Sequence, residues 1–399
     1  MNYWSSNNSY EIDFARAVVQ QWNRDHPQQP VKFQPVPEGQ SSEEVILAAV
    51  VGKTTPDIYS NMWQGDVEAY AEAGVLVPLD TFPDFLPYLY QRCDSNVVAE
   101  VTSNDRHIYQ IPWKINPIML IYNTRIMDGI GYHTPPATYS QFIDAGQKFK
   151  KDLNGDGYID QWIGYTEVLV TWWQRMFDFY PLYLAASGGG SLVKNNRVAF
   201  DNIYAVRVFE FLKTLFDRNY FSRERLSARQ DVFLSGVIAT RFTGPWEIMH
   251  AENFKPKGFE YAFSPLPVPD DFSGPAYTYC DPKNIVIFNT CKNPEMAWHF
   301  LKYLSNSDND LKFLELTNQL PRRKELLKNP RFSEYFRNNP RMVPFAQQAK
   351  FVKGTDNSPV LKEIFDIISQ EFEACVVYGR KQPEQAIKDA ARAAAVILK

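Results

Sequence analysis

A regular alternation of strand-like and helical segments at the start of the chain is the feature that most constrains its fold. The strand-like segments are short and rich in aromatic and β-branched residues, and each is followed by a segment predicted to be helical. The first of these, residues 10–25, has apolar residues at helical spacing. In chain order these segments are residues 3–4, 10–25, 31–36, 43–51, 57–59 and 66–73, with Gly74 placed to end the last helix. This β-α-β-α-β order predicts an α/β protein with a mainly parallel sheet and helices on its faces.

A second domain is predicted to begin after residue 115. Two strand-like segments bracket the connection Trp113–Pro117, and a helix is expected after Pro135–Pro136. The later expected elements are strands at 107–112, 118–123 and 238–243 and helices at 139–151, 172–186, 205–218 and 360–398. The chain shows no tandem repeat or long linker, so we expect two domains joined by short crossings.

Length and composition exclude several classes of protein. A chain of 399 residues is long enough for two domains with a large core. Its formal net charge of −4 supplies no positive excess to neutralise phosphates, which argues against general nucleic-acid binding. No apolar run reaches the ~18 residues of a membrane helix. The sequence enters a strand-like segment directly after Met1, as expected of a cytoplasmic protein or of an exported protein whose leader has been removed.

The cysteines and histidines do not form a recognisable metal or redox motif. Cys93, Cys280, Cys291 and Cys375 include no C-x-x-C pair, which argues against a zinc knuckle or a thioredoxin-type site. The strand-like run 284–288 holds Cys280 and Cys291 beyond disulfide reach if it is extended. We therefore expect four separate, mostly buried thiols. The five histidines are far apart in sequence and form no H-E-x-x-H pair.

Residues 152–161 carry the most specific local motif. Carboxylate or amide oxygens fall at loop positions 1, 3, 5 and 9, and Gly157 occupies position 6, where calcium loops require a sharp turn. Position 12 is Ile163 instead of a bidentate glutamate. The predicted ligands of a structural Ca²⁺ are Asp152, Asn154, Asp156, the backbone carbonyl of Tyr158, Asp160 and Gln161. The alternative is an Asx-rich turn that binds nothing.

The chain is rich in aromatic residues, with 28 Phe, 22 Tyr and 9 Trp. Some of these rings are expected to line a surface that binds something flat and partly apolar. Trp172, Trp173 and Trp246 lie at loop–helix junctions, where ligand-binding residues are common. Rings beside amides and carboxylates suit carbohydrate, because the ring stacks on C–H faces while polar groups bind the hydroxyls. Core packing is the alternative for each ring, and we assign Phe179 and Tyr183 to the core.

A catalytic function has weaker support. A glycosidase needs two carboxylates at one bond. Asp66, Glu247 and Asp281 lie near the aromatic segments, but no spacing marks a pair. The G-x-S-x-G, P-loop and G-x-G-x-x-G patterns are missing. The sequence therefore favours a non-catalytic carbohydrate-binding protein, with a secreted glycoside hydrolase as the alternative.

Eight short motifs occur in a defined order along the chain. They are Trp22–Pro27, Pro56–Tyr59, Ala71–Leu79, Tyr109–Asn123, Ala185–Gly189, Thr243–Trp246, Asn293–Trp298 and Leu320–Arg323. Each motif is weak alone, whereas the ordered set covers nearly the whole chain. In this set the chain resembles the family 1 extracellular solute-binding proteins of bacterial ABC importers, the sugar-binding group that includes maltodextrin-binding protein.

The resemblance implies a two-lobed periplasmic-binding-protein fold of type II-like topology, with a ligand cleft between the lobes. It implies an N-terminal lobe of residues 1–115 plus about 282–325. The C-terminal lobe would hold 116–281 plus about 326–399 and carry the loop 152–161. It also implies capture of a sugar by lobe closure, delivery to a membrane ABC permease, and a monomer without an organic cofactor. The protein would be exported, either periplasmic or lipid-anchored at the cell surface, with a signal sequence that is not part of this chain.

The resemblance also adds candidate ligand-binding residues to those found from the aromatic segments. Asn116 stands where some relatives carry an acidic residue, and Phe177 and Trp246 stand where relatives stack an aromatic ring. The complete set of candidates is Asn7, Asn8, Asn61, Trp63, Asn116, Trp172, Trp173, Phe177, Gly244, Trp246, Glu247, Tyr279, Asp281 and Arg323. A receptor of the same fold for a non-sugar solute, such as a polyamine, a phosphate ester or a peptide, is a further alternative.

Overall fold

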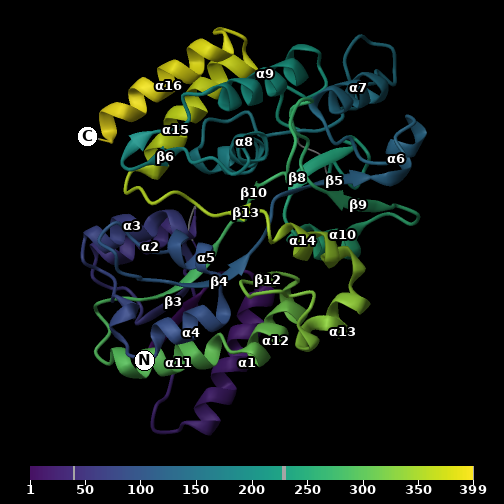
Figure 1. The fold of residues 1–399 in the computed structure, drawn as a ribbon. Coiled ribbons are helices and arrows are strands. Elements are labelled where there is room, and N and C mark those ends of the chain that lie inside the picture. Colours follow the sequence, from purple (N-terminus) through teal and green to yellow (C-terminus); the bar gives the residue numbers. More distant parts are fainter. Residues whose placement is uncertain (39–40, 227–230, 399) are drawn as a thin grey trace. The chain divides into compact units, whose positions relative to one another are not determined.

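The chain folds into two compact units, each with its own sheets and helices (Figure 1). The computed structural model describes residues 1–38, 41–226 and 231–398. Unit 1 consists of Met1–Asn116, Asp281–Ala346 and Asn357–Pro359. Unit 2 consists of Pro117–Cys280, Gln347–Asp356 and Val360–Lys399. The chain therefore passes from one unit to the other more than once.

Unit 1 is built on a six-stranded mixed sheet in the order β12-β4-β11-β3-β1-β2. β1 pairs in parallel with β2 and β3, as the alternation of strands and helices predicts. β11 is antiparallel to β3 and β4, and β12 is antiparallel to β4. The strands are β1 (Asn2–Ser5), β2 (Lys32–Pro35), β3 (Ile58–Trp63), β4 (Ile111–Ile115), β11 (Lys283–Ile287) and β12 (Leu320–Pro321).

Helices cover both faces of this sheet, and each face has a separate apolar core (Figure 1). Tyr3, Trp113 and Trp298 belong to the larger core, beneath α1, α4, α11 and α12. Tyr59 and Tyr70 belong to the smaller core, beneath α2 and α3. The helices of unit 1 are α1 (Ser9–Asp25), α2 (Ser42–Val51), α3 (Gln64–Glu72), η1 (Leu79–Thr81), α4 (Phe85–Arg92), α5 (Ser95–Glu100), α11 (Pro294–Leu304), α12 (Ser307–Thr317), α13 (Pro330–Asn338) and η3 (Pro340–Met342). α14 (Val343–Gln348) contains the point in the sequence where unit 1 ends.

Unit 2 has a central three-stranded antiparallel sheet in the order β8-β5-β9 and two smaller two-stranded sheets. Its strands are β5 (Met119–Asn123), β6 (Val193–Lys194), β7 (Arg197–Val198), β8 (Thr240–Thr243), β9 (Tyr261–Ser264), β10 (Thr278–Tyr279) and β13 (Val352–Lys353). Its helices are α6 (Thr124–Gly129), α7 (Tyr139–Phe149), η2 (Trp172–Met176), α8 (Phe179–Ser187), α9 (Ile203–Asp217), α10 (Trp246–Phe254), α15 (Leu361–Phe372), the π-helical turn η4 (Glu373–Val377) and α16 (Pro383–Ile397).

Residues 326–346 group with unit 1, whereas the resemblance placed them in the C-terminal lobe. The reason is local packing, since α13 lies against α12. The Tyr335 hydroxyl donates a hydrogen bond to Asn318 Oδ1 at 2.6 Å, just beyond the end of α12. The return to unit 2 therefore comes after Ala346.

Most of the predicted helices are confirmed, but those at 172–186 and 360–398 are each divided into shorter helices, and one predicted strand is displaced. Gly74 has φ +66° and follows α3, as expected for a residue that ends a helix in the left-handed conformation. The strand predicted at 107–112 instead spans Ile111–Ile115 and so extends into the predicted connection 113–117. Every residue of β4 is buried, including Lys114. Because a lysine interrupts the apolar residues, the sequence of this strand does not show the pattern expected of a buried strand.

The expectation of separate, buried thiols is confirmed. Cys93, Cys280, Cys291 and Cys375 are all in the described part of the chain, and all are buried and outside any disulfide. Within the described residues, no helix has both the length and the apolar character that crossing a bilayer requires.

Candidate functional site

Three aromatic rings of unit 2 gather around the ring of Phe177. Its ring centroid lies 6.5 Å from that of Trp173, 6.2 Å from that of Trp246 and 6.4 Å from that of Tyr279. All three pairs are edge-to-face, the geometry that aromatic quadrupoles favour. We call Trp173, Phe177, Trp246 and Tyr279 the aromatic cluster.

The aromatic cluster extends from the core of unit 2 to its surface. Tyr279 on β10 is fully buried, Phe177 and Trp246 are half-buried, and Trp173 is 42% exposed. Phe177 stands between η2 and α8, and Trp246 is the first residue of α10. These junctions present ring faces at the surface while buried neighbours hold the rings in place.

Gly244 is required by the position of the Trp246 ring. A Cβ atom at residue 244 would lie 2.2 Å from that ring, so any other residue would displace it. Trp63 in unit 1 has the same relation to Gly65, where a Cβ atom would lie 2.3 Å from the ring. Trp63 is only 2% exposed, so its ring is packed in the interior.

Two candidates near the aromatic cluster make other contacts. The half-buried Trp172 ring lies 5.3 Å from Lys362 Nζ, in a cation–π geometry. The buried Glu247 carboxylate faces Arg241 Nη1, which is 3.4 Å from each of its oxygens. Thr243 Oγ1 also donates to Glu247 Oε2 at 3.3 Å. Glu247 therefore fixes the first turn of α10, which begins with Trp246.

In unit 1, Asn61 lies in a polar group at the end of β3. Its Nδ2 is 3.3 Å from both the Tyr59 hydroxyl and Ser42 Oγ. Beside it, Lys283 Nζ donates to Glu43 Oε1 at 2.8 Å and lies 3.9 Å from Asp281 Oδ1. Burial raises the pKa of the Tyr59 hydroxyl, so the hydroxyl stays neutral and can donate a hydrogen bond. Hydroxyl, amide and charged groups converge here, as binding a polar solute requires.

A second polar group of unit 1 connects Asn116 to a buried ion pair. Asn116 Nδ2 donates to Gln319 Oε1 at 3.0 Å, and Gln319 Nε2 donates to Glu11 Oε1 at 2.7 Å. Glu11 Oε1 also accepts from Lys114 Nζ at 2.5 Å. Burial alone would raise the pKa of the Glu11 carboxyl, but Lys114, Gln319 and Ser6 together lower it. Among the described residues, none donates to the buried Asn116 Oδ1.

The remaining unit 1 candidates lie apart from these groups. Asn8 is the N-cap of α1, and its side chain accepts from the backbone N–H groups of Tyr10 and Glu11. Asn7 beside it is exposed. Arg323 donates from Nε to Asp310 Oδ2 and from Nη2 to Ser305 O at 2.9 Å. A ligand role for Arg323 would have to coexist with this ion pair.

The loop 152–161 is a chain of Asx turns on the surface of unit 2. Asp152 accepts the N–H groups of Gly155 and Gly157 at 2.7 and 2.8 Å, and Asp160 Oδ2 accepts that of Leu153 at 2.7 Å. Both glycines have positive φ, +78° and +90°. Hydrogen bonds from backbone N–H groups, with that of Gly157 having the largest effect, lower the pKa of the Asp152 carboxyl. The carboxyl therefore stays ionised. Gln161 uses its side-chain Nε2 to donate to Gly236 O at 3.1 Å.

Sequence reasoning missed the polar and charged residues that support these groups. Lys114, Gln319, Lys283 and Arg241 each reach a partner from a different element. The single local signal was a lysine inside the otherwise apolar segment Ile111–Ile115, because an unpaired lysine is rarely buried. The others depend on tertiary contacts.

Comparison with known proteins gives a family for most of the chain. Residues 17–340, well over half of the chain, match the family described as bacterial extracellular solute-binding protein. A binding protein of Brucella abortus is 24% identical over 296 residues, which cover 74% of this chain and 69% of that protein. The maltodextrin-binding protein of Bacillus subtilis is 27% identical over 239 residues, which cover 54% of this chain and 50% of that protein.

Solved structures share the whole fold. An uncharacterised protein of Listeria monocytogenes has a TM-score of 0.86 and 25% identity, covering 100% of this chain and 99% of that one. The cyclic alpha-maltosyl-1,6-maltose binding protein of Arthrobacter globiformis has a TM-score of 0.82 and 20% identity, covering 100% and 98%. The predicted periplasmic-binding-protein fold class is thereby confirmed. This chain belongs to the family of bacterial extracellular solute-binding proteins.

Proposed function

We propose that this protein is an extracytoplasmic receptor that binds a sugar or an oligosaccharide and delivers it to an ABC permease. The observation that carries the proposal is the aromatic cluster, with half-buried Phe177 and Trp246 and the more exposed Trp173. Such rings stack on the apolar faces of sugar rings. The names of the relatives from B. subtilis and A. globiformis, which refer to maltodextrin and to cyclic alpha-maltosyl-1,6-maltose, support a carbohydrate ligand.

The polar groups of unit 1 also suit a carbohydrate ligand. Asn61 and Asn116 offer amides, and the Glu43–Lys283 pair offers a carboxylate and an ammonium group. Amides and a carboxylate paired with an ammonium group suit the hydroxyls of a neutral ligand, which donate and accept in turn. A polyamine would instead need an excess of carboxylates.

A thermal-shift screen tests the proposal. We expect at least one oligosaccharide in a panel of α- and β-linked glucans, xylans and mannans to raise the melting temperature, because a ligand that binds only the native state stabilises it. Binding should be confirmed by calorimetry, with chromatography showing that the sugar is recovered intact. A panel that produces no shift would contradict the carbohydrate proposal, and released shorter sugars would favour a glycoside hydrolase.

We further propose that the loop 152–161 binds a structural Ca²⁺ ion. Three carboxylates and one amide of the loop supply hard oxygen donors, which this cation prefers. Each ionised carboxylate has about four lone-pair sites, so the bonds to loop N–H groups leave acceptors for the ion. Asp152, Asn154, Asp156, Asp160 and the Tyr158 carbonyl would hold it, with Gln161 oriented by its contact with Gly236. Bound calcium would stabilise the loop that follows α7.

Removal of calcium is expected to lower the melting temperature. EDTA should produce the decrease and added Ca²⁺ should reverse it, because the ion binds the folded loop alone. In zinc-free Asp152→Asn the melting temperature should no longer respond to either reagent. Asp201→Asn, an exposed aspartate elsewhere in unit 2, provides the matched control and should behave as wild type. If EDTA leaves the melting temperature unchanged and no calcium is retained, the loop is a plain turn.

A further inference from the structure

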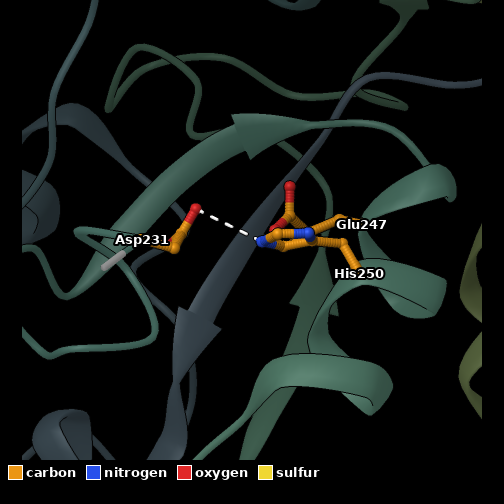
Figure 2. A group of neighbouring side chains, drawn as sticks. All are labelled: Asp231, Glu247 and His250. Atoms are coloured by element: carbon orange, nitrogen blue, oxygen red, sulfur yellow. Dashed lines mark ion pairs between the residues drawn. The ribbon is translucent and has the colours of Figure 1, made fainter. Parts of the chain in front are cut away.

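A group of three potential metal ligands lies in unit 2 at the start of α10. The ligand atoms of Asp231, Glu247 and His250 all lie within 4.8 Å of one another. Figure 2 shows Glu247 and His250 on the same helix. Both side chains face Asp231, which lies in the segment before β8. We call these three residues the Asp231 cluster. It is distinct from the loop 152–161, because it includes an imidazole and no residue of that loop.

The spacing in sequence accounts for this geometry. Glu247 and His250 are three residues apart on α10, so their side chains share one face of the helix. A Glu-x-x-His pair on a helix is a common arrangement for holding a transition metal. His250 Nε2 is 3.5 Å from Asp231 Oδ2. Two ligands of a tetrahedral Zn²⁺ with bonds near 2.0–2.1 Å lie about 3.4 Å apart, so small side-chain rotations would complete the site.

Arg241 provides an outer partner for the two carboxylates. Its Nη2 lies 3.0 Å from both oxygens of Asp231, and its Nη1 lies 3.4 Å from both oxygens of Glu247. A carboxylate has lone pairs for a guanidinium and a metal at once, and metal-binding carboxylates are generally hydrogen-bonded in this way. The guanidinium is also held against the Phe233 ring, 5.8 Å from its centroid.

The charge of the Asp231 cluster favours a cation. Two carboxylates and one guanidinium leave one net negative charge when His250 is neutral. The His250 side chain is 43% exposed, which gives an ion and a water ligand access from solvent.

We propose that Asp231, Glu247 and His250 bind one Zn²⁺ ion, with water as the fourth ligand and Arg241 as the outer partner. Nitrogen and carboxylate donors in a tetrahedral arrangement suit zinc. The alternative is a network of ion pairs that binds no metal. A metal site and such a network differ in whether the chain binds added zinc.

Zinc binding to the untagged chain tests the proposal, measured by calorimetry and by competition with a chromophoric chelator. Saturating calcium is present throughout, so that the loop 152–161 does not contribute. We expect one Zn²⁺ per chain, and His250→Gln and Asp231→Asn should each weaken binding by at least about tenfold. His250 is partly exposed, so its variant should keep the wild-type circular dichroism spectrum.

His133→Gln is the matched control. His133 also pairs with an aspartate of unit 2, since its Nδ1 lies 3.1 Å from Asp128 Oδ1. This variant should bind zinc as wild type does. Absence of stoichiometric zinc from the wild-type titration, or equal affinity in wild type and His250→Gln, would overturn the proposal. The readout is zinc alone, so it does not depend on the ligand that the receptor carries.

Discussion

Asp310→Asn is expected to lower the free energy of unfolding by about 3–5 kcal/mol, because the substitution leaves a buried arginine without its counter-charge. Asp310 is fully buried in unit 1. Its Oδ2 accepts from Arg92 Nη1 at 2.5 Å and from Arg323 Nε, and its Oδ1 accepts from Arg92 Nη2 at 3.3 Å. Arg92 is itself only 1% exposed, so water cannot replace the lost carboxylate. Urea denaturation of both proteins measures the difference.

Asp308→Asn on the same helix is the matched control for this prediction. Asp308 pairs with Arg331 at 2.6 Å, but both side chains are more than half exposed. An exposed ion pair contributes about 0–1 kcal/mol, so the control should unfold nearly as wild type does. Equal effects of the two substitutions would show that the Arg92–Asp310–Arg323 group does not stabilise unit 1 in the way described.

Trp246→Ala is expected to weaken carbohydrate binding by at least about tenfold, which corresponds to about 1.4 kcal/mol. The ring presents a large half-buried face beside Phe177, and buried tryptophans commonly dominate binding energies. Gly244→Ala should weaken binding as well, because the new Cβ would meet the Trp246 ring and displace it. Isothermal titration with the sugar found in the thermal-shift screen measures both effects.

Tyr378→Ala is the control for the loss of an aromatic ring. Tyr378 is 50% exposed in unit 2, after the π-helical turn and outside the aromatic cluster. Its removal should leave sugar affinity unchanged. Wild-type affinity in both Trp246→Ala and Gly244→Ala, with melting temperatures intact, would disprove the role of the aromatic cluster.

The fold was largely predictable because its helices carry strong local signals. α1 has apolar residues at helical spacing, and both α1 and α2 begin at side-chain N-caps and end where expected. β4 was misplaced because Lys114 is buried only through Glu11, which lies 103 residues away in the sequence. A local pattern cannot reveal a partner at that distance.

The candidate site was predictable in its residue types and less so in its contacts. Trp173, Phe177 and Trp246 were identified from their positions at loop–helix junctions and from the family resemblance, and the structure brings their rings together with Tyr279. Arg241 and Asp231 were missed because their contacts with α10 form only in the folded chain. The proposed calcium ligands come from one short loop, so their pattern could be recognised without knowledge of the fold.

The four buried cysteines allow the unfolding of each unit to be followed separately. Cys93 and Cys291 belong to unit 1, and Cys280 and Cys375 belong to unit 2. Burial raises the pKa of the Cys291 and Cys375 thiols to about 11, so little reactive thiolate exists in the native state. A thiol becomes available to an alkylating reagent when its surroundings unfold. Pulsed alkylation followed by peptide mass spectrometry would therefore time the unfolding of the two units separately, with no engineered probe.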